Sequence, residues 1–113
     1  MSAATEARLW YAQRISAMVL ALCVTVHLAT LVYATHEGLT AAAILGRTQG
    51  SILAGSFYAL FVIACAIHVP IGLARVFEEW LRWRGRVMWV ATLMIGAVTL
   101  GLGLCAVYAV VIK

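Results

Sequence analysis

Residues 52–73 read ILAGSFYALFVIACAIHVPIGL and carry no formally charged side chain. A run of about 18 or more apolar residues is long enough to cross the hydrocarbon core of a bilayer as a helix. Residues 15–33 and 87–112 form two further uncharged runs of this kind. Because backbone groups in lipid must be satisfied within each segment, and three spans cannot close a β-barrel, the sequence predicts an all-α fold, a three-helix transmembrane bundle.

We expect a single transmembrane domain over residues 1–113, with helices at about 12–34, 51–76 and 86–112. The first apolar run is full length and follows a polar segment, Thr5 to Arg14. A secretory signal peptide has a shorter apolar region, so we interpret the run as a true membrane span.

The composition excludes several classes of protein. Hydrophobic residues make up 65% of the 113 residues and charged residues 11%, whereas a soluble domain is roughly a quarter charged. The formal net charge is +4, from 8 Lys and Arg against 4 acidic residues. These cations lie at the ends of apolar runs rather than on one soluble face, so we expect no nucleic-acid partner.

The positions of the arginines predict an orientation in the membrane. The first span is preceded by Arg8 and Arg14, and the loop of residues 34–51 carries only Arg47. Between the second and third spans lie Arg75, Arg82, Arg84 and Arg86. The positive-inside rule places the amino terminus and this second loop in the cytoplasm or a mitochondrial matrix, and the carboxyl terminus outside. We expect a multi-pass protein of the bacterial cytoplasmic membrane, whose arginine-rich loop also suits an acidic partner surface or anionic membrane lipid.

Two histidines, His27 and His68, lie within the first and second spans. A polar side chain at that depth is costly, which makes it a functional hypothesis by default. The alternative is a cofactor-free structural subunit, in which each neutral imidazole bonds to a neighbouring helix. Ala64 and Gly72 share the helix face of His68 and leave room for a flat macrocycle. Pro70 should kink the helix beside His68 and open a pocket.

The metal chemistry favours haem over zinc or copper. No close spacing of Cys and His residues is present, and no carboxylate lies within a span. The cysteines, one in each span, are expected to be small buried residues; they are Cys23, Cys65 and Cys105. Haem needs only an axial imidazole from each side and an apolar slot. Its work is then electron transfer.

The depths of the two histidines differ. At helical rise, His27 lies ~20 Å beyond Arg14, while His68 lies ~10 Å before Arg75. We therefore expect two haem levels rather than one iron held by both imidazoles. The second ligand of each iron must come from another bundle. The chain is thus predicted to be half of a haem-binding bundle, completed by a second copy or a partner subunit.

Residues 14–28, RISAMVLALCVTVHL, resemble the first helix of the cytochrome b membrane anchors of succinate dehydrogenase and fumarate reductase. Residues 68–75, HVPIGLAR, resemble the haem-binding helix of that family, in which His is followed four residues later by Gly. The resemblance implies a subunit that tethers a flavoprotein and an iron–sulfur protein, binds one or two haem b groups and exchanges electrons with quinone. His68 matches the inner haem ligand, and His27 matches the outer ligand of two-haem members. Ala17 departs from the glycine that is usual in the family.

The resemblance also matches Arg14 and Ser16 to residues that border the quinone site in one-haem members. The alternatives are an arginine that extends to lipid headgroups and a serine that bonds its own backbone. Further quinone candidates are Gln13, Arg75 and Tyr11. At the start of the outer loop, His36 and Glu37 form either a solvated turn or a proton exit. A haem b subunit of another respiratory complex is the remaining alternative.

Overall fold

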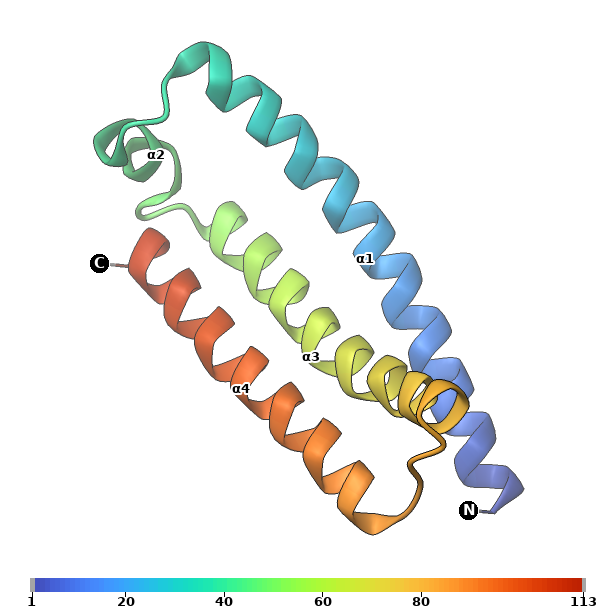
Figure 1. Ribbon diagram of the computed structural model, residues 1–113. Helices are drawn as coiled ribbons and strands as arrows, with labels where there is room; N and C mark the ends of the chain where they lie inside the picture. Colours follow the sequence, from blue (N-terminus) through green and yellow to red (C-terminus); the bar gives the residue numbers. More distant parts are fainter. Residues whose placement is uncertain (1, 113) are drawn as a thin grey trace.

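The computed structural model describes residues 2–112. These residues form four helices, α1 (Ala3–Glu37), α2 (Ala41–Thr48), α3 (Ile52–Trp80) and α4 (Arg86–Val111) (Figure 1). The three long helices contain 35, 29 and 26 residues, and each is long and apolar enough to cross a membrane. The prediction of an all-α fold with three long apolar helices is confirmed.

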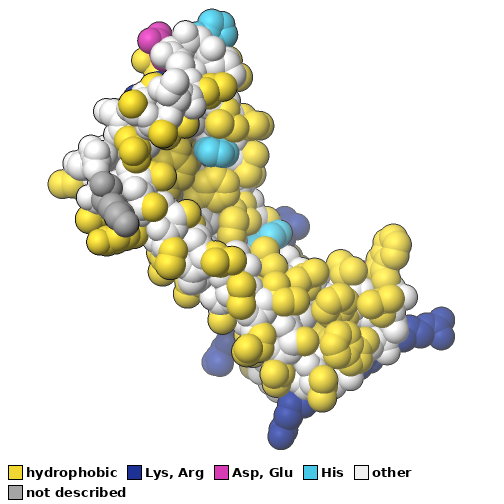
Figure 2. All heavy atoms as spheres, turned by 60° about the vertical axis from the view of Figure 1, so that its left-hand side comes forward, with side chains coloured by type: hydrophobic (Ala, Val, Ile, Leu, Met, Phe, Trp, Pro, Cys, Tyr) yellow, Lys and Arg dark blue, Asp and Glu magenta, His cyan; other side chains and the backbone are white. Residues whose placement is uncertain are grey.

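The long helix α3 lies between α1 and α4 (Figure 1). The amino terminus and the loop between α3 and α4 are at one end of the molecule, and α2 and the end of α4 are at the other (Figure 1). Lys and Arg side chains gather mainly at the first of these ends, while hydrophobic side chains cover most of the visible flank (Figure 2). Such a flank suits lipid rather than water.

Short helix α2 lies within residues 34–51, where the sequence predicted only a loop. The Thr40 hydroxyl caps its first turn by accepting from the backbone N–H of Ala43 at 3.1 Å. Two bonds then hold α2 in place. Arg47 donates to the Gly38 carbonyl at 3.0 Å, and the Thr48 hydroxyl donates to the Val110 carbonyl on α4 at 2.6 Å.

Both α1 and α3 are longer than expected at the amino-terminal end of the molecule. The helix α1 begins at Ala3 and takes in the polar segment before the first apolar run, while α3 continues through Pro70 to Trp80. These extensions contact each other through Arg75, which donates to Glu6 of α1 at 2.7 Å and to Glu78 at 3.0 Å. The ion pairs lie where the helices reach the end of the apolar region.

Close packing joins α3 to α4. A Cβ atom on Gly96 would lie 2.8 Å from Pro70 Cγ, and one on Gly103 would lie 2.5 Å from Val62 Cγ1. Glycine is therefore required for the observed separation, as at many helix interfaces in membranes.

Candidate functional site

His68 lies on α3 against α1, where it contacts Ser16. The Ser16 hydroxyl oxygen is 3.3 Å from His68 Nδ1 and 3.1 Å from the Gln13 carbonyl oxygen. Because a serine hydroxyl carries one hydrogen, its donation to the Gln13 carbonyl leaves it to accept from Nδ1–H of His68. This arrangement selects the tautomer in which the His68 Nε2 lone pair is free.

Gly72 makes room for Gln13 rather than for a macrocycle. A Cβ atom at this position would lie 3.2 Å from Gln13 Nε2, so the amide of Gln13 occupies the space that the sequence suggested for a flat ring. Within residues 2–112, the buried Gln13 Oε1 has no hydrogen-bond partner. The expected slot beside Gly72 is thus filled by a side chain of α1.

The pocket expected beside Pro70 lies between α3 and α4. Its volume is about 310 Å³. It is lined by Ile63, Ala66, Ile67, Pro70, Leu93, Gly96, Ala97 and Leu100. His68 is not among these residues, because its ring is turned toward Ser16 on α1. The proline therefore opens space on the face of α3 that the histidine does not use.

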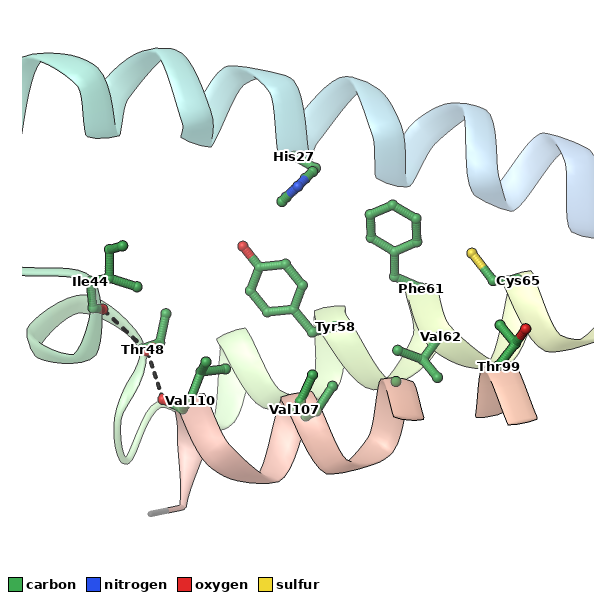
Figure 3. Close-up of a pocket in the computed structure, with 12 residues that line it drawn as sticks. His27, Ile44, Thr48, Tyr58, Phe61, Val62, Cys65, Thr99, Val107 and Val110 are labelled. Carbon is green, nitrogen blue, oxygen red and sulfur yellow. Dashed lines mark hydrogen bonds between the residues drawn. The ribbon is translucent and has the colours of Figure 1, made fainter. Parts of the chain in front are cut away.

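A larger cavity lies beside His27, between α1 and the helices α2, α3 and α4 (Figure 3). Its volume is about 460 Å³. The ring of His27 meets Tyr58 and Phe61 edge-on, with ring centroids 5.9 and 5.7 Å apart. In Figure 3 the Tyr58 hydroxyl is directed toward α1, the helix that carries His27. His27 Nδ1 is buried and, within the described residues, has no hydrogen-bond partner.

The two histidines lie at separate levels, as their positions in the sequence predicted. Ser16, the neighbour of His68, and His27 are both on α1, and at helical rise they are about 16 Å apart. Histidine side chains reach the surface at different heights along the molecule (Figure 2). No cluster of three His, Cys, Asp or Glu side chains suited to a metal ion is found in the part of the chain described.

The two quinone candidates, Arg14 and Ser16, occupy different surroundings. Ser16 is only 4% exposed and is engaged by His68. Arg14 is exposed, with its guanidinium 5.2 Å from the centroid of the Trp10 ring, in cation–π contact. The structure does not bring these two side chains into one binding site.

A cavity of about 630 Å³ lies between the amino-terminal part of α1 and the end of α3. It is lined by Glu6, Ala7, Leu9, Trp10, Gln13, Ile71, Arg75 and Glu79. Two of the further quinone candidates, Gln13 and Arg75, line it. The third, Tyr11, is exposed and stacks edge-on against Trp10, with ring centroids 5.1 Å apart.

His36 and Glu37 form the exposed end of α1. His36 Nδ1 is 3.0 Å from the Val32 carbonyl oxygen and 3.3 Å from the Thr35 hydroxyl. These local contacts fit a solvated helix end.

Sequence reasoning missed Tyr58 and Phe61 as partners of His27. The available signal was their spacing: residues three and four apart share a face of a helix, so Tyr58, Phe61 and Cys65 form one row on α3. All three line the cavity beside His27. Tyr58 is the polar member of that row, and it lies within an apolar span at the same level as His27.

Comparison with known protein families, with curated proteins and with solved structures finds no match to this chain. Its function is therefore argued from the surroundings of the two intramembrane histidines.

Proposed function

We propose that the chain is a haem b-containing membrane anchor of a succinate:quinone oxidoreductase, which passes electrons between an iron–sulfur subunit and membrane quinone. One observation carries this proposal. The contact between Ser16 and His68 Nδ1 occupies one nitrogen of an intramembrane imidazole and leaves the other free. The resemblance in residues 14–28 and 68–75 supplies the class of complex.

The surroundings of His68 suit an axial ligand. A histidine that binds a metal almost always donates its other ring N–H to a neighbouring group, which fixes the tautomer and the ring orientation. Ser16 provides that neighbour from α1, and its burial holds the oxygen in place. In the described chain, no hydrogen bond competes for His68 Nε2. His68 and Ser16 are thus the ligand and its positioning partner.

The position of His68 favours a site shared with another polypeptide. Its side chain is only half-buried, so Nε2 is accessible from outside the three long helices. Within residues 2–112, no second histidine is near it. The opposite axial ligand would come from a second anchor copy or a sister subunit, and the chain is then one half of a haem-binding bundle. When bound, haem supplies one-electron transfer, while the apolar helices control the dielectric around it.

The charged end of the molecule suits the soluble partners of such a complex. The loop after α3 exposes Arg82, Arg84 and Arg86, and the amino terminus lies at the same end (Figure 1). By the positive-inside rule this end faces the cytoplasm of a bacterium. The iron–sulfur protein and the flavoprotein would dock there, and Arg14 is the candidate for holding a quinone at this boundary.

A cofactor-free structural subunit is the competing function. The Ser16–His68 contact also fits this function, because a hydrogen bond between α1 and α3 stabilises the helix pair without any iron. Under this hypothesis His68 Nε2 would find its partner on a neighbouring polypeptide. The two functions predict different visible absorbance for the purified protein, because only one of them requires a porphyrin.

The test is to purify the chain from membranes with its associated subunits and to record a reduced-minus-oxidised absorbance spectrum. We expect the bands of a b-type cytochrome, together with a flavoprotein and an iron–sulfur protein among the co-purifying chains. A preparation without b-type absorbance would contradict the haem proposal. Haem without those two partners would instead indicate a haem b subunit of another respiratory complex.

A further inference from the structure

The connection between α3 and α4 carries free positive charge. We call residues 80–87, which make this connection, the arginine loop. Three of its arginines are exposed, and within residues 2–112 none of the three forms an ion pair. They are Arg82, Arg84 and Arg86. The nearby acidic side chains have other surroundings, since Glu78 bonds Arg75 and Glu79 lines the cavity shared with α1.

We propose that the arginine loop binds the phosphate groups of an anionic phospholipid such as phosphatidylglycerol, rather than the acidic side chains of a soluble protein. A guanidinium group keeps its charge at ordinary pH and bonds phosphate oxygens with two parallel N–H groups. The inference does not rest on haem or on the class of complex, because it uses only the membrane spans and this loop. It assigns the loop arginines to lipid, so the soluble subunits of the proposed complex would contact other groups at the same end.

Exposed apolar side chains lie on both sides of the arginines. Trp80, Leu81 and Val87 are 81%, 66% and 71% exposed. Tryptophan is enriched at the boundary between hydrocarbon and headgroups, which accommodates an apolar ring with a polar edge. Lipid at this depth contacts the apolar side chains and the guanidinium groups at the same time. The acidic surface of a soluble protein matches the charges but not these apolar side chains.

Basic side chains are distributed around this end of the molecule rather than gathered on one side of it. In Figure 2, the Lys and Arg side chains at this end project in different directions. A single docked protein would meet them from one side. Lipid headgroups surround the end of a membrane span, and clusters of basic residues next to a span attract anionic lipid. The distribution of charge therefore favours lipid.

The shape of the arginine loop is fixed by contacts within the chain. The Phe77 carbonyl accepts from the backbone N–H groups of Leu81 at 3.2 Å and Trp83 at 3.0 Å. The rings of Phe77 and Trp83 have centroids 5.3 Å apart. Between these bonds, Arg82 has a φ of 52°, in the left-handed region that favours glycine. Glycine at this position would therefore preserve the turn while removing one guanidinium group.

Electron paramagnetic resonance of spin-labelled lipids tests the preference. The purified protein with its associated subunits is reconstituted in phosphatidylcholine bilayers with a trace of spin-labelled phosphatidylglycerol or spin-labelled phosphatidylcholine. The motionally restricted fraction of each label measures how strongly that lipid associates with the protein. We expect phosphatidylglycerol to be preferred about fivefold, the factor for one arginine near an anionic membrane surface, and added salt to reduce the preference. Equal association of the two lipids would overturn the inference.

Substitutions test whether the arginine loop causes the preference. In Arg82→Gly, which suits the backbone of the turn, we expect the preference to fall about twofold with no decrease in the unfolding midpoint. A triple variant that adds Arg84→Gln and Arg86→Gln should have no preference. Arg8→Gln is the matched control, because it removes an exposed arginine at the same end but outside the loop. Equal losses in Arg8→Gln and Arg82→Gly would mean that net charge alone attracts the lipid, and would overturn the inference.

The outcomes also separate lipid from protein as the partner of the loop. Loss of the preference in the triple variant, with its associated subunits and haem b content preserved, would support the inference. If the triple variant lost its flavoprotein and iron–sulfur subunits but kept the preference, the loop would be a protein docking surface and the inference would be wrong. A preparation without b-type absorbance that still prefers phosphatidylglycerol through the loop would contradict the proposed function and support this inference.

Discussion

His68 and His27 face the same interface, between α1 and α3, at two levels with opposite packing. At the level of His68 the helices approach through a buried serine and a glycine, Ser16 and Gly72. At the level of His27 the facing residues of α3 are Tyr58 and Phe61, and a cavity remains beside their rings. Side-chain size therefore sets the separation of two helices along a single interface.

This difference carries over to the polar groups. Close approach brings the Ser16 hydroxyl within reach of His68 Nδ1, whereas wider separation leaves His27 Nδ1 without a partner in the described chain. A satisfied nitrogen fixes the ring for a metal on the other nitrogen. The buried Nδ1 of His27 has no such restraint from the described residues. Two residues of one type thus have different chemistry because of their neighbours.

The substitution His68→Ala should have the largest effect, because it removes the proposed axial ligand. We call the level of His68, where α1 and α3 approach closely, the closed level. We expect haem b at this level to be lost and assembly with partner subunits to be weakened. The measurement is haem b per polypeptide, from the reduced-minus-oxidised spectrum, with His36→Ala as the matched control. If His68→Ala kept its full b-type absorbance, His68 would not be a haem ligand. The contact with Ser16 would then not distinguish the function of His68 from that of His27.

The substitution Gly72→Leu should force the closed level apart. A Cβ atom added at Gly72 would already lie 3.2 Å from Gln13 Nε2, so a larger side chain must displace Gln13 from the interface. Overpacking of this kind costs about 1–3 kcal/mol. We expect a lower unfolding midpoint in detergent and weaker haem retention. Gly101→Leu is the control, since nothing lies within 4 Å of a Cβ at that glycine; equal losses in both variants would show that the interface is not the cause.

The substitution Ser16→Ala should loosen His68 without removing it. Losing one hydrogen bond of this kind costs about 1 kcal/mol. The imidazole also becomes less basic when Nδ1–H loses its acceptor, so we expect the midpoint potential of the haem to rise. Ser16→Thr keeps the hydroxyl and should restore the potential, while the exposed Ser56→Ala should change nothing. A stability loss with no change in potential would limit Ser16 to a packing role.

Much of the fold was predictable because it depends on length and composition. Three uncharged runs predict three spans whatever their neighbours, and helical rise places His27 and His68 at different levels. The short helix α2 was missed because tertiary bonds from Arg47 and Thr48 help to hold it. Its local signals, Thr40 as a cap and a run of alanines, are weak in eight residues.

The sites were less predictable because they depend on which side chains face each other across an interface. Gly72 suggested room for a ring, but a residue of α1, Gln13, occupies that space. The contact between the Ser16 hydroxyl and His68 Nδ1 was not predicted either. Neither pairing follows from spacing along one helix, since each joins residues of α1 and α3. Rotation of each helix about its axis decides such contacts, and a single sequence does not specify it.

The substitution Arg75→Gln should have the smallest effect, and it tests whether ion pairs or packing keep the closed level closed. Arg75 bonds Glu6 of α1 and Glu78, but its side chain is 34% exposed and that of Glu6 is 45% exposed. Water and salt screen such pairs, so their contribution is about 0–1 kcal/mol. We expect a slight decrease in the unfolding midpoint that diminishes with added salt, and no change in haem content. Arg8→Gln is the control, because Arg8 is exposed on α1 and forms no ion pair within residues 2–112. A large, salt-independent loss of haem in Arg75→Gln would mean that the ion pairs, rather than Ser16 and Gly72, hold α1 against α3 at the level of His68.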